Sequence, residues 1–151
     1  MIPVTQTKLV SETQKRGNCL MASIASIMEK TLDEVPDLEA IEDAGTPYPD
    51  SLVAALHELG LQFCSIFPHS TNTAPLGYSV IIGRGARGCL HACVAHNGLL
   101  VHDPHPSRDG LLTVSYYLEL FPVGDEMPDT IPFPGDAAVL NANISAIPQG
   151  V

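Results

Sequence analysis

Two kinds of hydrophobic pattern divide the chain near residue 60, with helical spacing before it and strand-like runs after it. Between Cys19 and Lys30, apolar side chains recur so that they form one stripe along a helix, at Leu20, Met21, Ile24, Ile27 and Met28. This spacing predicts an amphipathic helix, which we place at Leu20–Lys30. A short extended segment ending at Gln6 and a polar loop over residues 7–18 precede it.

Two further helices are expected before the pattern changes. Thr31 and the acidic residues after it predict a helix that reaches about Ala44. Asp50 or Ser51 begins a third helix, which Gly60 ends.

The later runs, with their turn signals, predict strands. We expect strands at Leu61–Phe67, Tyr78–Ile82, Cys89–His96, Leu99–Asp103 and Leu111–Val114. A short helix is expected at Tyr116–Phe121. Helices followed by strands, without alternation, indicate an α+β domain.

Composition limits the domain plan and the partners. We expect one domain over residues 1–121 and a proline-rich wrap or tail over residues 122–151. Seventeen acidic and seven basic residues give a formal net charge of −10, which argues against nucleic acid and anionic membranes as partners. Neither a membrane span nor a signal pattern is present, so we expect a cytoplasmic protein.

Cys19 stands where the first predicted helix begins, directly after Asn18, a residue type that often caps helices. The N-terminus of a helix favours an anion, so a cysteine there tends to have a lowered pKa and more of the nucleophilic thiolate. The alternative is an ordinary buried thiol, since free cysteines are among the most buried residues.

A catalytic thiolate needs a base and a group that orients this base, and His91 and Asp103 can supply both. The two lie on strands joined around Asn97-Gly98. A two-residue turn would place their side chains on opposite faces, whereas a three-residue loop that includes His96 would make them direct cross-strand neighbours. We favour the three-residue loop.

This order of Cys19, His91 and Asp103 resembles the papain-like cysteine peptidases. It is most similar to the double-glycine leader peptidase domains of bacteriocin exporters, through the Cys19 helix, His91-Ala92-Cys93-Val94 and Val101-His102-Asp103-Pro104. Small phage and bacterial proteins with a Gln-Thr and then a Gly-Asn-Cys opening are similar too, here at Gln6-Thr7 and Gly17-Asn18-Cys19. The resemblance covers residues 2–121 and implies N-terminal helices packed on a C-terminal antiparallel sheet.

The same resemblance implies a thiol hydrolase that acts on a peptide or protein substrate. Either Gln6 or Gln14 would form the oxyanion hole with the backbone N–H of Cys19; Gln14 has nearly the usual spacing, but Gln6 follows the apolar segment and is slightly favoured. Asn18 and His105 are expected to contact substrate. No metal or organic cofactor is expected.

Two other interpretations stay open. The first is a catalytically silent papain-like binding protein, such as a phage-encoded inhibitor of a host factor, because Leu20 replaces the glycine that leader peptidases carry after their cysteine. The second is a metal-binding protein, because histidines and cysteines crowd between Cys89 and His105. The expected register separates the histidines onto two faces, which disfavours a single site for all of them.

Overall fold

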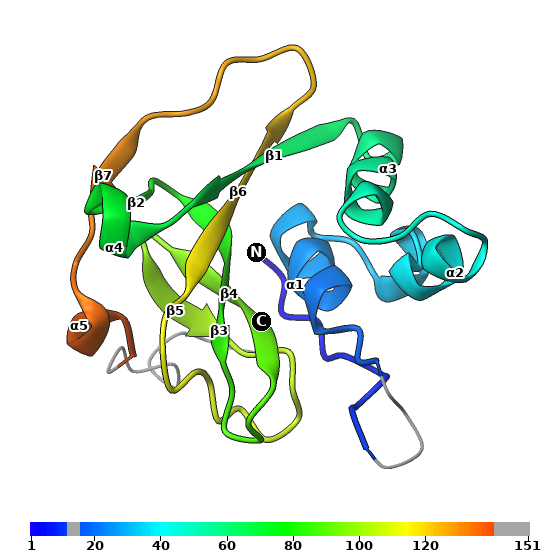
Figure 1. Cartoon of the computed structure of the whole chain (residues 1–151), viewed down its shortest axis with the longest axis horizontal. Coiled ribbons are helices and arrows are strands. Elements are labelled where there is room, and N and C mark those ends of the chain that lie inside the picture. The colour runs from blue at the N-terminus through cyan, green and yellow to red at the C-terminus, as the bar shows by residue number, and fades with distance from the viewer. Residues whose placement is uncertain (12–15, 141–151) are drawn as a thin grey trace.

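The computed structural model describes residues 1–11 and 16–140, and Figure 1 shows the chain as helices beside a twisted sheet. The fold is α+β, with helices in the N-terminal part and an antiparallel sheet in the C-terminal part, as the sequence predicts. Across the described ranges, no helix combines the length and the hydrophobicity that a membrane span requires.

The first predicted helix is α1, Cys19–Met28. Its apolar stripe is buried, and Glu29 ends it in the left-handed conformation, with a φ of 57°. The Lys30 N–H then bonds the carbonyl of Ala25, which closes the helix terminus.

The second predicted helix is instead two short pieces, η1 (Leu32–Glu34) and α2 (Leu38–Asp43). Pro36 separates them because a residue before proline favours extended backbone, as Val35 has here. Asp37 caps α2 by accepting a hydrogen bond from the Ala40 N–H. The third helix is α3 (Asp50–Glu58), as expected.

The main sheet has the strand order β1-β6-β3-β4-β5, and its paired strands are antiparallel. Its strands are β1 (Leu61–Ile66), β3 (Tyr78–Arg84), β4 (Leu90–His96), β5 (Leu99–His102) and β6 (Tyr116–Pro122). A small second sheet pairs β2 (Thr73–Pro75) with β7 (Thr130–Pro132), and two short helices, α4 (Pro68–Thr71) and α5 (Asp136–Leu140), complete the described elements.

Two predictions for the later part of the chain are wrong. Tyr116–Phe121 lies within β6 rather than in a helix, because it pairs with both β1 and β3 and its successive residues enter opposite cores. The segment 111–114 forms only an isolated bridge, between Leu111 and Gly85, instead of a strand.

Hydrophobic side chains are buried on both faces of the sheet. One core lies between α1, α3 and the sheet and includes Ile24, Leu56 and Leu118. The second core contains Tyr117 and Val139, and it lies against β2, β7 and α5, which Figure 1 shows across the sheet from α1. The described part of the proline-rich segment, residues 122–140, therefore contributes a strand and a helix to the second core.

Candidate active site

Cys19 is the first residue of α1 and is half-buried. Asn18 occupies the N-cap position of this helix and its carbonyl accepts from the Ala22 N–H, but its side chain makes no capping bond. Its Oδ1 instead accepts hydrogen bonds from the backbone N–H groups of Thr7 (3.0 Å) and Lys8 (2.9 Å). Asn18 thus ties the N-terminal segment to the start of α1, and it does not line the cleft that holds Cys19.

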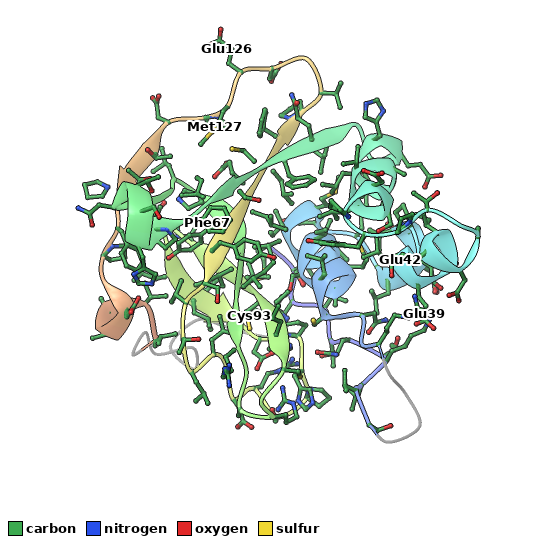
Figure 2. The ribbon with its side chains drawn as sticks, in the orientation of Figure 1. Glu39, Glu42, Phe67, Cys93, Glu126 and Met127 are labelled. Carbon is green, nitrogen blue, oxygen red and sulfur yellow. The ribbon has the colours of Figure 1, made fainter. Side chains whose placement is uncertain are left out.

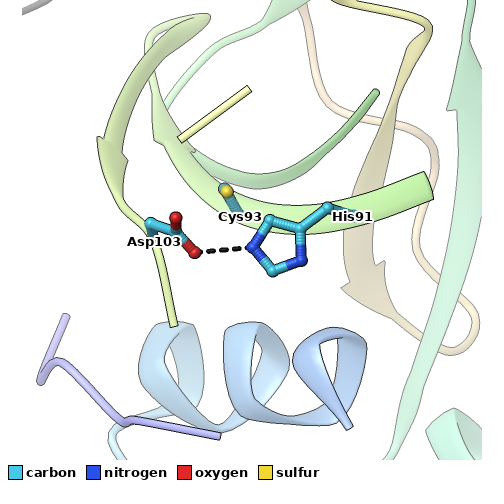
Figure 3. A group of neighbouring side chains, drawn as sticks. All are labelled: His91, Cys93 and Asp103. Carbon is cyan, nitrogen blue, oxygen red and sulfur yellow. Dashed lines mark hydrogen bonds and ion pairs between the residues drawn. The ribbon is translucent and has the colours of Figure 1, made fainter. Parts of the chain in front are cut away.

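His91 and Asp103 meet through a hydrogen bond of 2.6 Å between His91 Nε2 and Asp103 Oδ1, drawn in Figure 3. Their side chains are 6% and 0% exposed, so the pair is shielded from water. Cys19 interacts with the His91 ring strongly enough to raise the pKa of the imidazole. With Nε2 engaged by Asp103, Nδ1 is the nitrogen that can serve the thiol.

The turn that brings these strands together differs from the predicted one. His96 pairs with Leu99, so Asn97-Gly98 is a two-residue turn, and the φ values of 50° and 79° suit a type I′ turn. The prediction of a three-residue loop and of direct pairing between His91 and Asp103 is therefore wrong.

With the two-residue turn alone, His91 and Asp103 would point to opposite faces of the sheet. A β-bulge brings them back to the same face. Val94 pairs with His102 but Ala95 pairs with Leu100, which leaves Val101 as an extra residue on β5. The shifted register brings Asp103 level with Cys93 on β4. His91, two residues before Cys93, then points to the same face, so the contact with Asp103 is diagonal.

Asp103 is held by backbone donors as well as by His91. Its Oδ1 accepts from the His105 N–H (2.8 Å), and its Oδ2 accepts from the Gly110 N–H (2.7 Å). Burial raises the pKa of Asp103, but these hydrogen bonds and the contact with His91 outweigh burial and lower the pKa below its usual range. The carboxylate is therefore ionised at neutral pH.

His91 is biased toward its charged form. Burial lowers its pKa, but hydrogen bonds to Asp103 and Cys19, together with their negative charges, raise the pKa to about 9. An imidazolium between a carboxylate and a thiolate is the arrangement that keeps a nucleophilic cysteine ionised.

The loop 104–110 is tied to the N-terminal segment beside this pair. The backbone N–H of Gln6 donates to the carbonyl of Pro104 over 2.9 Å. Arg108 Nη1 donates to the carbonyls of Asp103 and His105, and Nη2 donates to Thr5 Oγ1 over 2.7 Å. These bonds hold the loop that supplies the amide donors to Asp103, and they place Gln6 next to that loop.

Cys19 and His91 line one cleft of about 400 Å³, together with Gln6 and His105. Further walls come from α2 and from the turn between β3 and β4, which contribute Glu39, Glu42, Arg87 and Cys89. Figure 2 shows Glu39 and Glu42 on the helical side of the molecule. A second cavity of about 360 Å³, beside η1 and α2, is lined by neither Cys19 nor His91.

Of the two glutamines proposed for the oxyanion hole, the structure places only Gln6 in the cleft among the residues it describes. Gln6 is buried and lines the cleft, and its Nε2 donates to the carbonyl of Lys8 over 2.9 Å. An amide nitrogen carries two hydrogens, so the second remains for a ligand. Gln14 lies outside the described residues.

Of the histidines near the site, His105 lines the cleft, and its ring lies 6.2 Å from the His91 ring between centroids. Its contact with substrate stays a prediction. His102 is fully buried and contacts the carbonyl of Val4 through Nε2.

Cys93 lies beside the pair on the same strand as His91, as Figure 3 shows. The potential ligand atoms of His91, Cys93 and Asp103 lie within 4.8 Å of one another, so these residues could hold a metal ion. Burial, and then the charge of Asp103, raise the pKa of Cys93 well above its usual range. Cys93 is therefore a protonated thiol in the protein without metal.

Several residues that shape the site were not among the predicted ones. A Cβ on Gly85 would lie 3.1 Å from the Cβ of His91, so this glycine leaves room for the ring. At Gly83, a Cβ would lie 1.8 Å from the carbonyl oxygen of Thr113, which no side chain permits. The repeated glycines in residues 83–88 are the sequence signal for this close packing, but glycines alone indicate no more than a loop. Arg87 and Tyr48 line the cleft without any motif that marks them.

No protein-family model matches this chain, and no curated protein or solved structure matches it above the significance threshold.

Proposed function

We propose that this protein is a thiol hydrolase of papain-like organisation, which cleaves a peptide, isopeptide or related amide bond. One observation carries the proposal: the thiol at the start of α1 shares a cleft with His91, whose Nε2 is bonded to the buried Asp103. Three features support the papain-like assignment: the order of the three residues along the chain, Cys19 at the start of a helix, and His91 on one strand with Asp103 directly after the end of the neighbouring antiparallel strand.

In the proposed reaction, the Cys19 thiolate attacks the carbonyl carbon and forms a tetrahedral intermediate. We assign its oxyanion to the Cys19 N–H and Gln6 Nε2 as donors, with a contribution of about 3 kcal/mol per donor in comparable sites. The imidazolium of His91 gives its proton to the leaving nitrogen as the C–N bond breaks. Water, deprotonated by His91, then attacks the acyl thioester, which releases the acid and regenerates the thiolate; an amine in place of water would give transfer.

The experiment that tests this proposal is alkylation of each cysteine by iodoacetamide as a function of pH, followed by mass spectrometry. We expect Cys19 to react fastest of the cysteines at neutral pH, because the imidazolium of His91 favours the nucleophilic thiolate. His91→Ala should return Cys19 to ordinary reactivity. His57→Ala, which removes an exposed histidine on α3, is the matched control and should change nothing.

Hydrolysis itself is tested by incubating the protein with a peptide mixture and identifying new termini. Wild type should cleave and Cys19→Ala should not. If Cys19 reacts no faster than Cys64 and Cys89, which are also half-buried, the hydrolase proposal is wrong. That result would favour the catalytically silent binding protein.

A further inference from the structure

Different charges line different walls of the cleft. On α2, Glu39 and Glu42 contact Arg16, which also lines the cleft, at 3.6 and 3.2 Å. Asp43 contacts the same guanidinium at 2.6 Å, so three carboxylates share one cation. The turn between β3 and β4 instead contributes the cation Arg87. The whole chain carries a net charge of −10, so Arg87 is a positive charge on a protein that is negative as a whole.

The guanidinium of Arg87 is only partly used by the protein. Among the described residues, it contacts Ser107 Oγ at 3.3 Å and Asp109 Oδ2 at 3.6 Å, both through Nη1. The contact with Asp109 is too long for a hydrogen bond, and the Asp109 side chain is 53% exposed, so it is a weak partner. Nη2 and Nε remain to bind a planar anion in a fork.

Arg87 lies on the side of the cleft where the leaving group must sit. His91 donates the proton to the leaving nitrogen, so the leaving amine has to lie against His91. The His105 ring borders His91, and Ser107 Oγ contacts His105 Nδ1 at 2.8 Å as well as Arg87. A continuous row of His91, His105, Ser107 and Arg87 therefore borders the position of the leaving group.

We propose that Arg87 forms an anion-binding subsite for a carboxylate on the leaving group, so that the preferred substrates are amides whose amine portion carries a carboxylate close to the scissile nitrogen. This inference rests on the proposed hydrolase function. The carboxylate comes either from a free C-terminus or from an Asp or Glu side chain just after the scissile bond, and both sources present the same planar anion to Arg87.

Two alkylating reagents test the subsite without a known substrate. Iodoacetate and iodoacetamide are similar in size and reactive group, but only iodoacetate carries a carboxylate. We compare their rates at Cys19 at pH 7.5 and low salt, with Cys64, which is half-buried and does not line the cleft, as an internal reference. Burial and the charge of Arg87 both lower the pKa of His105, so His105 is not the cation of this row. His91 and Arg16 also line the cleft, but they are unchanged in the Arg87 variants, so a change in the rate ratio reports on Arg87.

Arg87→Gln should slow the alkylation of Cys19 by iodoacetate about three- to tenfold, the range for a partly exposed charge contact. The rate with iodoacetamide should stay within about twofold of the wild-type rate. Arg87→Lys should recover part of the loss. Arg84→Gln, which removes the same charge from the exposed end of β3, should leave the ratio of the two rates unchanged. A ratio that does not respond to Arg87→Gln, or responds equally to Arg84→Gln, overturns the subsite.

The peptide mixture separates the two sources of the carboxylate. If the free C-terminus binds, cleavage one or two residues from the end disappears when the peptides are amidated. If acidic side chains bind, cleavage before Asp or Glu persists after amidation; in either case Arg87→Gln removes the preference, and its persistence overturns the inference. Slow reaction of Cys19 with iodoacetamide in wild type would instead contradict the hydrolase proposal alone, because the rate ratio is measured separately.

Discussion

The Asp103 carboxylate is fully buried, and hydrogen bonds from the chain replace those that water would donate to it. A buried carboxylate is costly unless donors replace its hydration shell. Asp103 has three such donors, His91 Nε2 and the N–H groups of His105 and Gly110. Both its charge and its orientation are therefore set by neighbours that can be altered one at a time.

We expect Asp103→Asn to lower the free energy of unfolding by about 1–3 kcal/mol, although the two side chains have the same shape. An amide has one acceptor oxygen, so its NH₂ group would face a buried N–H of His105 or Gly110, or the His91 ring. Chemical denaturation measures the change, and Asp109→Asn, at an exposed carboxylate in the same loop, is the control. Equal stability of the two variants would contradict the role given to the backbone donors.

The paired charges also predict how stability depends on pH. The pKa of His91 is raised to about 9, so its contribution is complete below the unfolded-state pKa of about 6.5 and is lost as pH rises through 9. The lowered pKa of Asp103 gives a contribution that is present above about 3.9 and is lost as pH falls. The stability difference between wild type and His91→Ala should therefore be larger at pH 5.5 than at pH 9.5.

Urea unfolding at pH 5.5, 7.5 and 9.5 measures this difference directly. His57→Ala removes an exposed histidine and should give a difference that changes little between pH 7.5 and 9.5. A difference between wild type and His91→Ala that grows with pH would show that His91 is neutral in the folded protein.

At the scale of elements, the hairpin of β4 and β5 determines whether His91 and Asp103 can meet. Its two-residue turn would put them on opposite faces, and the extra residue Val101 corrects this. The turn conformation requires φ values that glycine adopts at little cost, and Gly98 has a φ of 79°. A Cβ on Gly98 would also lie 2.9 Å from the Cβ of Ala74.

We predict that Gly98→Ala lowers the free energy of unfolding by roughly 2–4 kcal/mol, from left-handed backbone strain and from overpacking against Ala74. Gly124→Ala is the matched control, because Gly124 has a φ of 92° and its added Cβ would meet nothing within 4 Å. It should cost about 1–2 kcal/mol, from backbone strain alone. Chemical denaturation of the two variants measures both changes. Equal losses of unfolding free energy would show that overpacking against Ala74 contributes nothing.

The same hairpin marks the limit of what the sequence could predict. Local patterns were sufficient for α1 and α3, whose apolar faces pack in the first core. They were also sufficient for placing His91 on a strand and Asp103 at the end of the neighbouring strand. The bulge at Val101 has no local signature, since a one-residue shift depends on what each face packs against. For Tyr116–Phe121, pairing with β1 and β3 overrides a short helical spacing.

At the scale of the whole molecule, the sheet has a core on each face, and the site lies where α1 meets β4. Cys93 belongs to the second core, yet it is also a neighbour of His91 and Asp103. Val139 of α5 is buried in that same core. The segment 122–140 is therefore connected to the candidate site through the packing behind Cys93.

This connection makes Cys93 a reporter of whether the second core opens. Its thiol is fully buried and protonated, so N-ethylmaleimide can label it only after an opening of the structure.

Val139→Ala removes two buried methyl groups and should lower the free energy of unfolding by about 1.5–2.5 kcal/mol. If the opening unit includes α5, labelling of Cys93 should accelerate roughly tenfold or more, at tenfold per 1.4 kcal/mol. Val53→Ala makes the same chemical change at a position that is 48% exposed on α3, and it should leave the rate unchanged. If Val139→Ala destabilises the protein but Cys93 keeps its wild-type labelling rate, α5 separates from the sheet without exposing the residues behind the site, and the proposed coupling between the two is absent.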